Sequence, residues 1–183
     1  TEVTIPKSVT KVGDNYWGNV FEKCTNLDTV IFEEGTTTVP GYILQSASYV
    51  KNVVIPETVT CIGDKAFYGC TSLTEITLPS SLTTIEAEAF YECKGLVEIT
   101  VPDSVTKIGD SAFENCTGLE HINLSSGLTD IGHGAFENCT ALEEIIFPAS
   151  LISIGRGAFY KCTSLTEVTI PKSVTKVGDN YWG

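Results

Sequence analysis

Apolar residues recur along the whole chain with a fixed spacing. A leucine or valine stands at positions that lie 23 residues apart, namely Leu27, Val50, Leu73, Leu96, Leu119, Leu142 and Leu165. When residues 73–95 are aligned with residues 96–118, their apolar positions coincide column by column. Such a period predicts a repeat protein, in which each unit is one small structural element that packs on its neighbours.

Each unit divides into three segments. The apolar positions of residues 73–78 fit a short strand, which ends at Pro79 because proline has no amide hydrogen to donate to a sheet. Leu82 and Ile85 begin the return path. An Ala-Phe pair followed by cysteine, within residues 89–93, has the spacing of one helical turn with an inward face. The pattern therefore predicts strand, turn and helical turn in every unit.

The units are expected to stack with their strands in parallel, about 4.8 Å apart, because no unit can bury its own apolar side. Equivalent side chains then form ladders inside the stack. The predicted core ladders hold the aromatic residues Phe67, Phe90, Phe113, Phe136 and Phe159 and the cysteines Cys24, Cys70, Cys93, Cys116, Cys139 and Cys162. Phe21 extends the aromatic ladder, whereas Leu44 and Ala47 replace the Phe and the Cys of the second unit.

The cysteines are expected to be free. A cysteine at the same inward position in successive units behaves as a small buried hydrophobe, and stacked thiols rarely have the geometry of a disulfide. Their spacing is also unlike that of a zinc ligand set. Cys61 occupies a different column, so we expect it to be exposed and to be the most reactive thiol.

Two units depart from the pattern. Residues 27–49 lack the Pro, the Gly and the Cys of the repeat, which predicts an irregular turn side for this unit. The first unit carries a four-residue insertion, residues 15–18, that includes Tyr16 and Trp17. We expect these aromatic side chains to form an exposed pair that could anchor a partner.

The two ends of the chain are identical over 18 residues. Residues 1–18 recur without change as residues 166–183, an offset of 165 that equals six units of 23 residues and one of 27. This duplication predicts a higher-order repeat of 165 residues. We interpret residues 1–183, a single solenoid domain with a partial unit at each end, as a segment of a longer array or of a filament in which this block recurs.

Charge excludes some partners. The chain has 11 basic and 23 acidic residues, a formal charge of -12, whereas binding to nucleic acid or to anionic membranes depends on Lys and Arg. Its apolar runs fall short of the roughly 18 residues that span a bilayer. We therefore expect no nucleic-acid partner and no membrane insertion within this segment.

The assembled repeat is LxxIxIPxSVxxIGxxAFxxC, as in LVEITVPDSVTKIGDSAFENC at residues 96–116. It resembles the BspA-like leucine-rich repeats, also called the Treponema pallidum type, over essentially the whole chain. The resemblance implies a right-handed, curved leucine-rich-repeat solenoid of about eight coils, with a parallel β-sheet on the concave face and short helical turns and loops on the convex side. It also implies a secreted or surface-attached protein, without catalytic residues, that adheres to host matrix proteins, host cells or other microbes.

Outward strand positions form two columns on the expected sheet face. One column holds Glu2, Thr29, Asn52, Glu75, Glu98, His121, Glu144 and Glu167, and the other holds Thr4, Ile31, Val54, Thr77, Thr100, Asn123, Ile146 and Thr169. The acidic column could bind a basic partner or a bridging calcium ion, most strongly around Glu120, Glu143 and Glu144. It could equally be a solvated face that is kept charged for solubility. Our candidate binding residues are Tyr16, Trp17, Glu75, Glu98, His121, Glu144 and Glu167.

Two functions remain open. The first is adhesion or protein binding outside the cell, with protein or glycan ligands on host or neighbouring cells. The second is a structural role, in which copies of the block join end to end in a fibre. An enzyme is disfavoured because the sequence has no nucleophile elbow, HExxH or Walker motif, and apart from calcium we expect no cofactor or metal. In a eukaryote, Asn115, Asn123 and Asn138 would be possible glycosylation sites.

Overall fold

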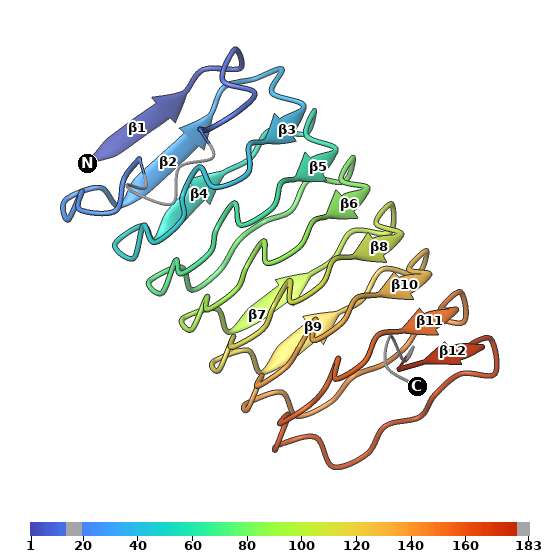
Figure 1. Cartoon of the computed structure of the whole chain (residues 1–183). Coiled ribbons are helices and arrows are strands. Elements are labelled where there is room, and N and C mark those ends of the chain that lie inside the picture. Colours follow the sequence, from blue (N-terminus) through green and yellow to red (C-terminus); the bar gives the residue numbers. More distant parts are fainter. Residues whose placement is uncertain (14–19, 179–183) are drawn as a thin grey trace.

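The chain winds into a β-solenoid of about seven turns, each about 23 residues long. The computed structural model describes residues 1–13 and 20–178. Successive turns lie side by side in sequence order, so the first and last strands lie at opposite ends of the stack (Figure 1). One continuous core of apolar side chains runs through it. The predicted leucine-rich-repeat solenoid is therefore confirmed.

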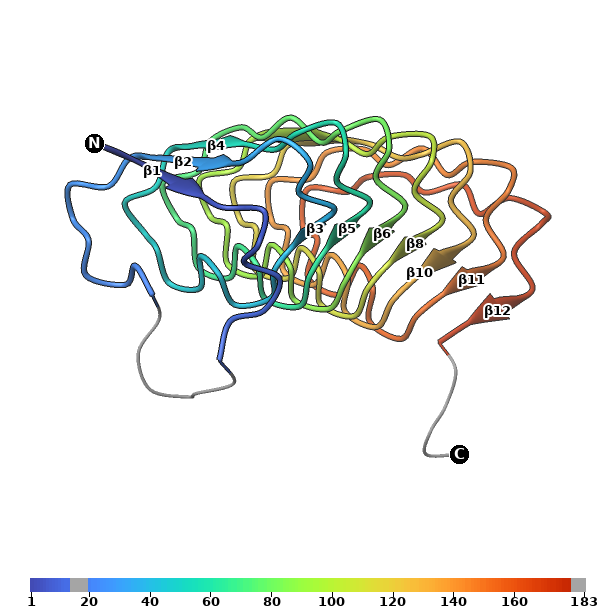
Figure 2. The ribbon, with the colours of Figure 1, turned by 90° about the horizontal axis from the view of Figure 1, so that it is seen from above.

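Short parallel strands form on two faces of the stack (Figure 2). The first face carries β1 (Glu2–Ile5), β2 (Thr29–Phe32) and β4 (Asn52–Val54) in one sheet, and β7 (Glu98–Thr100) and β9 (His121–Asn123) in another. The second face carries one seven-stranded sheet, in the order β12 (Lys176–Val177), β11 (Ser153–Ile154), β10 (Asp130–Ile131), β8 (Lys107–Ile108), β6 (Thr84–Ile85), β5 (Cys61–Ile62) and β3 (Thr38–Val39).

The register of these strands follows the sequence repeat. Thr29 pairs with Asn52, and Thr84 pairs with Lys107, so the partners are 23 residues apart. Glu2 instead pairs with Thr29, an offset of 27. The four-residue insertion therefore lies between β1 and β2, and it leaves the pairing of equivalent residues intact.

The sheet on the second face is formed by residues that the sequence pattern assigns only to the return path. Each of its strands has two residues, which is too short to show an alternating pattern in the sequence. In β6, Ile85 is fully buried while Thr84 is partly exposed. The sheet forms because the same two positions of successive turns pair with one another.

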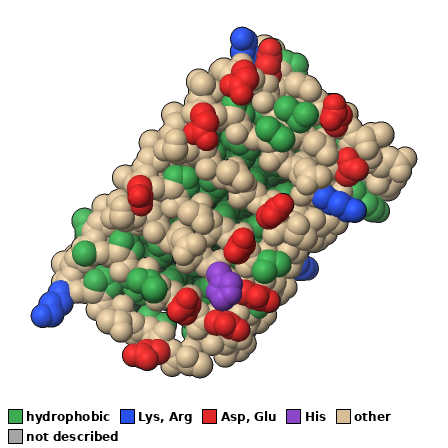
Figure 3. Space-filling model, turned by 180° about the vertical axis from the view of Figure 1, so that it is seen from behind, with side chains coloured by type: hydrophobic (Ala, Val, Ile, Leu, Met, Phe, Trp, Pro, Cys, Tyr) green, Lys and Arg blue, Asp and Glu red, His purple; other side chains and the backbone are tan. Residues whose placement is uncertain are grey.

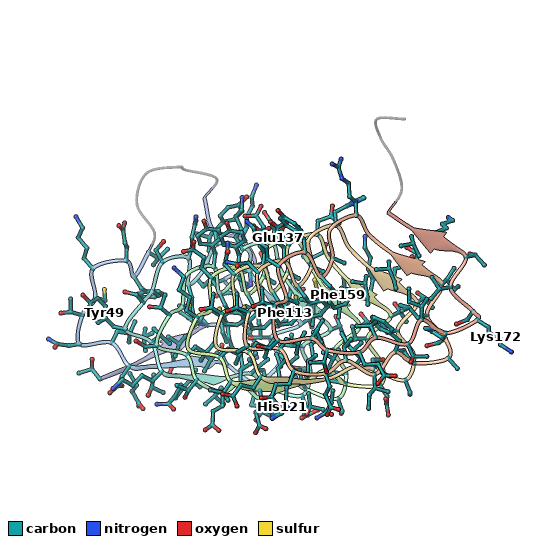
Figure 4. All side chains as sticks on the ribbon, turned by 90° about the horizontal axis from the view of Figure 1, so that it is seen from below. Tyr49, Phe113, His121, Glu137, Phe159 and Lys172 are labelled. Atoms are coloured by element: carbon teal, nitrogen blue, oxygen red, sulfur yellow. The ribbon has the colours of Figure 1, made fainter. Side chains whose placement is uncertain are left out.

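Aromatic rings form a continuous stack inside the core. Neighbouring rings from Phe67 to Phe159 have centroids 5.1 to 5.3 Å apart and interplanar angles of 19° or less. The rings from Phe67 to Phe136 are fully buried, whereas Phe159, near the end of the stack, is partly exposed and also meets Phe147 edge to face at 5.6 Å. Figure 4 shows Phe113 and Phe159 within the loop of backbone.

The cysteine ladder is also internal, with one exception. All seven cysteines are free, and Cys70, Cys93, Cys116, Cys139 and Cys162 are buried. Each of these five thiols donates a hydrogen bond to a carbonyl oxygen 26 residues earlier, as Cys93 does to Phe67 at 3.1 Å.

The placement of Cys24 in the core was wrong, because its side chain is exposed. Each of the other five ladder thiols donates to a carbonyl oxygen of the preceding turn. In the described chain, no turn precedes the one that contains Cys24. Cys61, expected to be exposed, is partly buried in β5, and burial raises its pKa. Cys24 is therefore the more accessible of these two thiols.

The side of the stack that was predicted to contain helical turns has a different backbone. We call it the turn side; it comprises residues 63–70 and their equivalents. Within the described residues no helix forms there, and left-handed residues such as Lys65 (φ 54°) and Glu88 (φ 52°) interrupt the path. Amides then point along the stack, so that Phe67 N–H donates to the carbonyl of Ala89 at 2.8 Å.

The second unit is more regular than its sequence suggested. Tyr42 and Ser46 adopt the same positive φ as their equivalents in other turns. Their amides, and that of Leu44, donate to the next turn as elsewhere on the turn side. The expected irregularity was wrong, because backbone bonds between turns impose the path on a sequence that lacks the motif.

Candidate functional site

The first face presents the two predicted columns to solvent. Glu75, Glu98, His121, Glu144 and Glu167 are all exposed and occupy one column. Residues Glu98 and His121 are direct partners in the register of β7 and β9. Figure 3 views the molecule from this face and shows scattered acidic side chains around one histidine, with Lys and Arg side chains at the rim. The structure thus brings these five predicted residues into one row.

The neighbouring column is less polar than its threonines suggest. Val54 is 52% exposed and Ile146 is 77% exposed. Between them lie Thr77, Thr100 and Asn123, and the amide of Asn123 donates to the Thr100 hydroxyl at 3.3 Å. A partner that covers both columns would meet carboxylates on one row and aliphatic and hydroxyl groups on the next.

The first face is hollowed where its strand pairing stops. Residues 75–77 and 144–146 belong to no strand, and an open hollow lies beside each. The hollows measure about 500 and 530 Å³. Glu75, Thr77, Glu98 and Thr100 line the first, and Glu144, Ile146, Glu167 and Thr169 line the second. The sequence gives no signal for either hollow, because these residues fit the strand pattern as well as their neighbours do.

In the described part of the chain, none of the ion pairs involves a residue of the acidic column. The ion pairs found there lie elsewhere, between Lys65 and Glu88 at 3.2 Å and between Lys94 and Glu92 at 3.6 Å, or at the amino terminus. Carboxylates on adjacent rungs repel one another, and the repulsion is screened by salt. The column is therefore electrostatically complementary to a basic surface.

Other predicted features have different outcomes. Tyr16 and Trp17 lie outside the described residues. Among residues 1–13 and 20–178, no helix is long and apolar enough to cross a bilayer. Within the same ranges, His, Cys, Asp and Glu side chains form no cluster of three or more suited to a metal ion.

The repeat identifies the family of the chain. Residues 1–117 and 60–182 match the family described as BspA type leucine rich repeat region. Together these two ranges cover nearly the whole sequence. The chain belongs to this leucine-rich-repeat family. Leucine-rich repeats of this kind are typically non-enzymatic binding proteins. No protein of curated function matches the chain in sequence.

Solved structures share the fold. A leucine-rich repeat protein from Bacteroides ovatus is 30% identical, with a TM-score of 0.83 over 97% of this chain and 48% of the other. The Treponema pallidum leucine-rich repeat protein is 26% identical, with a TM-score of 0.78 over 91% of this chain and 78% of the other. The chain thus spans about half the length of the Bacteroides ovatus protein.

A leucine-rich cell surface protein from Faecalibacterium prausnitzii is more distant. It is 23% identical, with a TM-score of 0.53 over 97% of this chain and 78% of the other. At this identity the likeness establishes the fold alone.

Proposed function

We propose that this chain is a non-enzymatic, surface-exposed binding module whose first face holds a basic protein partner. The observation that carries the proposal is the row of exposed carboxylates at Glu75, Glu98, Glu144 and Glu167, none of which forms an ion pair within the described structure. Membership in a family of binding repeats supports it. The exposed Val54 and Ile146 would add apolar contact area.

Binding to a graded panel of proteins tests this proposal. The immobilised chain is exposed by surface plasmon resonance to basic and acidic extracellular matrix proteins at low and high salt. Basic members should bind, and their association should slow as salt rises, because salt screens charges beyond about 10 Å at 0.1 M. The absence of binding by basic proteins, or binding that salt does not change, contradicts the proposal.

A matched pair of triple variants locates the surface. The first variant combines Glu75→Gln, Glu98→Gln and Glu144→Gln and should slow association about tenfold, within the range that electrostatic steering contributes. The control combines Glu22→Gln, Glu34→Gln and Glu86→Gln, three exposed carboxylates outside the column. Both variants change net charge equally, so an equal loss of binding would show that net charge, and not the column, attracts the partner.

The insertion gives a second contact to test. Tyr16→Ala and Trp17→Ala are measured in the same assay. We propose that the aromatic pair anchors the partner, so either substitution should speed dissociation several-fold, because aromatic anchors act mainly after encounter. Unchanged dissociation would remove the insertion from the proposed surface.

A bridging calcium ion is a separate proposal for the same column. Thermal unfolding is followed while calcium is added, with magnesium as the control. A ligand that binds only the folded state raises the melting temperature. The double variant Glu143→Gln with Glu144→Gln should abolish the calcium effect; no shift in the wild-type chain ends the calcium proposal.

A structural role is the second candidate, and the 165-residue duplication favours it. If the block recurs in one polypeptide, a chain with two blocks should form one continuous rod. Seven turns at a strand spacing of about 4.8 Å give about 34 Å of length per block. Small-angle scattering on one-block and two-block chains measures this increment, and two independently tumbling bodies would contradict the continuous stack.

A further inference from the structure

A polar hollow of about 510 Å³ opens on the turn side, away from the proposed protein-binding face. Figure 4 shows Glu137 of this hollow on the opposite side of the solenoid from His121. We call it the turn-side pocket; its polar wall consists of Asp110, His133, Glu137, Arg156 and Tyr160. Its volume lies within the roughly 300–1,000 Å³ of small-molecule sites.

Two glycines make room for the pocket. Gly134 and Gly157 line it, with φ of 58° and 66°. The equivalent residues of earlier turns are Lys65, Glu88 and Ser111, with φ between 52° and 54°. The backbone conformation is thus shared, and larger residues adopt it in the same chain. A Cβ atom at Gly157 would meet only ordinary contacts, the nearest 3.8 Å away, so the missing side chain leaves open space rather than relieving a clash.

The polar wall is held in place by bonds between turns. The His133 amide donates to Asp110 Oδ1 at 2.8 Å, and the Arg156 amide donates to His133 Nδ1 at 3.0 Å. Because Nδ1 accepts this bond, the neutral imidazole carries its proton on Nε2 and can donate with it. The side chains of Asp110 and His133, from successive turns, are therefore positioned before any ligand arrives, which lowers the entropic cost of binding.

An exposed aromatic ring completes the pocket. Tyr160 is 58% exposed, and Lys161 Nζ lies 5.0 Å from the centre of its ring. Tyr68 and Tyr91, at equivalent positions of earlier turns, stack on each other with centroids 4.7 Å apart. The turn before Tyr160 has Glu137 at this position, so the ring and the carboxylate both border the hollow.

We propose that the turn-side pocket binds a sugar residue of a glycan. Carboxylate, guanidinium and imidazole groups together offer acceptors and donors, which matches hydroxyl groups that both donate and accept. The exposed ring of Tyr160 suits the C–H face of a pyranose, because aromatic faces carry negative potential. The negative charges of Asp110 and Glu137 would repel a polyanion. The described residues contain no group of three or more His, Cys, Asp or Glu side chains that could hold a metal ion.

Glycan binding by the whole chain tests the proposal. The chain is applied to a printed array of mammalian and bacterial glycans, and the methyl glycoside of the sugar shared by bound glycans is studied by saturation-transfer NMR. Tyr160→Ala should weaken binding of that glycoside about tenfold. Gly157→Lys, which copies Lys65 at the same backbone conformation, should fill the hollow and abolish binding.

Two controls make the test specific. Tyr49→Ala removes another exposed tyrosine, 45% exposed and outside the pocket, and should leave glycan binding unchanged. The melting temperature of each variant checks that the fold is retained. An array without bound glycans, or binding that survives both pocket variants, overturns the proposal. The triple variant of the first face should bind the glycoside normally, so failure of one proposal is distinguishable from failure of the other.

Discussion

Residues 1–13 and 166–178 have the same sequence, TEVTIPKSVTKVG, but they form different strands. The first copy forms β1 on the first face and no strand on the second. The second copy forms β12 on the second face and no strand on the first. Ile5 is 6% exposed, whereas its equivalent Ile170 is 53% exposed. The same sequence therefore forms its strand on the first face in one copy and on the second face in the other.

The difference comes from the neighbour of each copy. The first copy packs on the turn that contains β2, which supplies a complete pairing partner. The second copy packs on the turn in which residues 144–146 form no strand but Ser153 and Ile154 do. Each of these strands pairs with a strand of an adjacent turn, because a single turn cannot satisfy its own backbone groups.

The largest expected effect compares the middle of the stack with its end. Phe113→Ala removes a fully buried ring that stacks on both sides and should lower the free energy of unfolding by about 4 kcal/mol. Phe159→Ala, at a partly exposed position, should cost about 2 kcal/mol. Urea unfolding measures both, and equal losses would show that position in the stack does not set the energy.

The second prediction uses the duplicated sequence directly. Ile5→Ala should cost about 3 kcal/mol because the side chain is buried, whereas Ile170→Ala should cost less than about 1 kcal/mol. Native-state hydrogen exchange of the β2 and β11 amides reports the local opening energies. Equal losses of stability for Ile5→Ala and Ile170→Ala would contradict this prediction.

The third prediction is that an added neighbouring turn makes the two copies of the duplicated sequence equivalent. Residues 19–49 are added after Gly183, so that the 165-residue period continues. Ile170 should then become buried, and Ile170→Ala should cost about 2 kcal/mol more than in the original chain. The same hydrogen-exchange measurement decides; an unchanged cost would argue that the period does not extend the stack.

The last prediction compares a buried thiol with an exposed one. Burial raises the pKa of Cys116 to about 12. Because the folded pKa lies above the unfolded value, the buried neutral thiol stabilises the protein fully below about pH 8.5, and this contribution is lost as pH rises toward the folded pKa. By pH 10, which lies about 1.5 units above the unfolded pKa, the loss is about 2 kcal/mol.

Cys116→Ala should therefore reduce the fall in stability between pH 8 and pH 10 by that amount. Cys24→Ala, at an exposed position, should leave the fall unchanged. Chemical unfolding at the two pH values gives the difference. If both variants behave like the wild-type chain, burial of the ladder thiols does not contribute to the alkaline sensitivity of the fold.

Much of the fold and part of the candidate site could be predicted from periodicity. The 23-residue spacing placed Glu98 and His121 side by side, as their register bears out. Periodicity did not predict the pocket around Gly134 and Gly157, because a glycine in a turn is ordinarily explained by the positive φ that glycine adopts easily. Only the shared positive φ of Ser111 and Lys65 reveals that the glycines leave space instead.

The sequence by itself determined the period and the residues that share each inward or outward column, because these depend only on spacing along the chain. The tertiary structure decided which segments are strands, where the first face is hollowed and which cysteine is exposed. Those properties depend on the adjacent turn, through hydrogen bonds between residues 23 or 26 positions apart. Residues 1–13 and 166–178 demonstrate the division, since one sequence has two outcomes that only their neighbours distinguish.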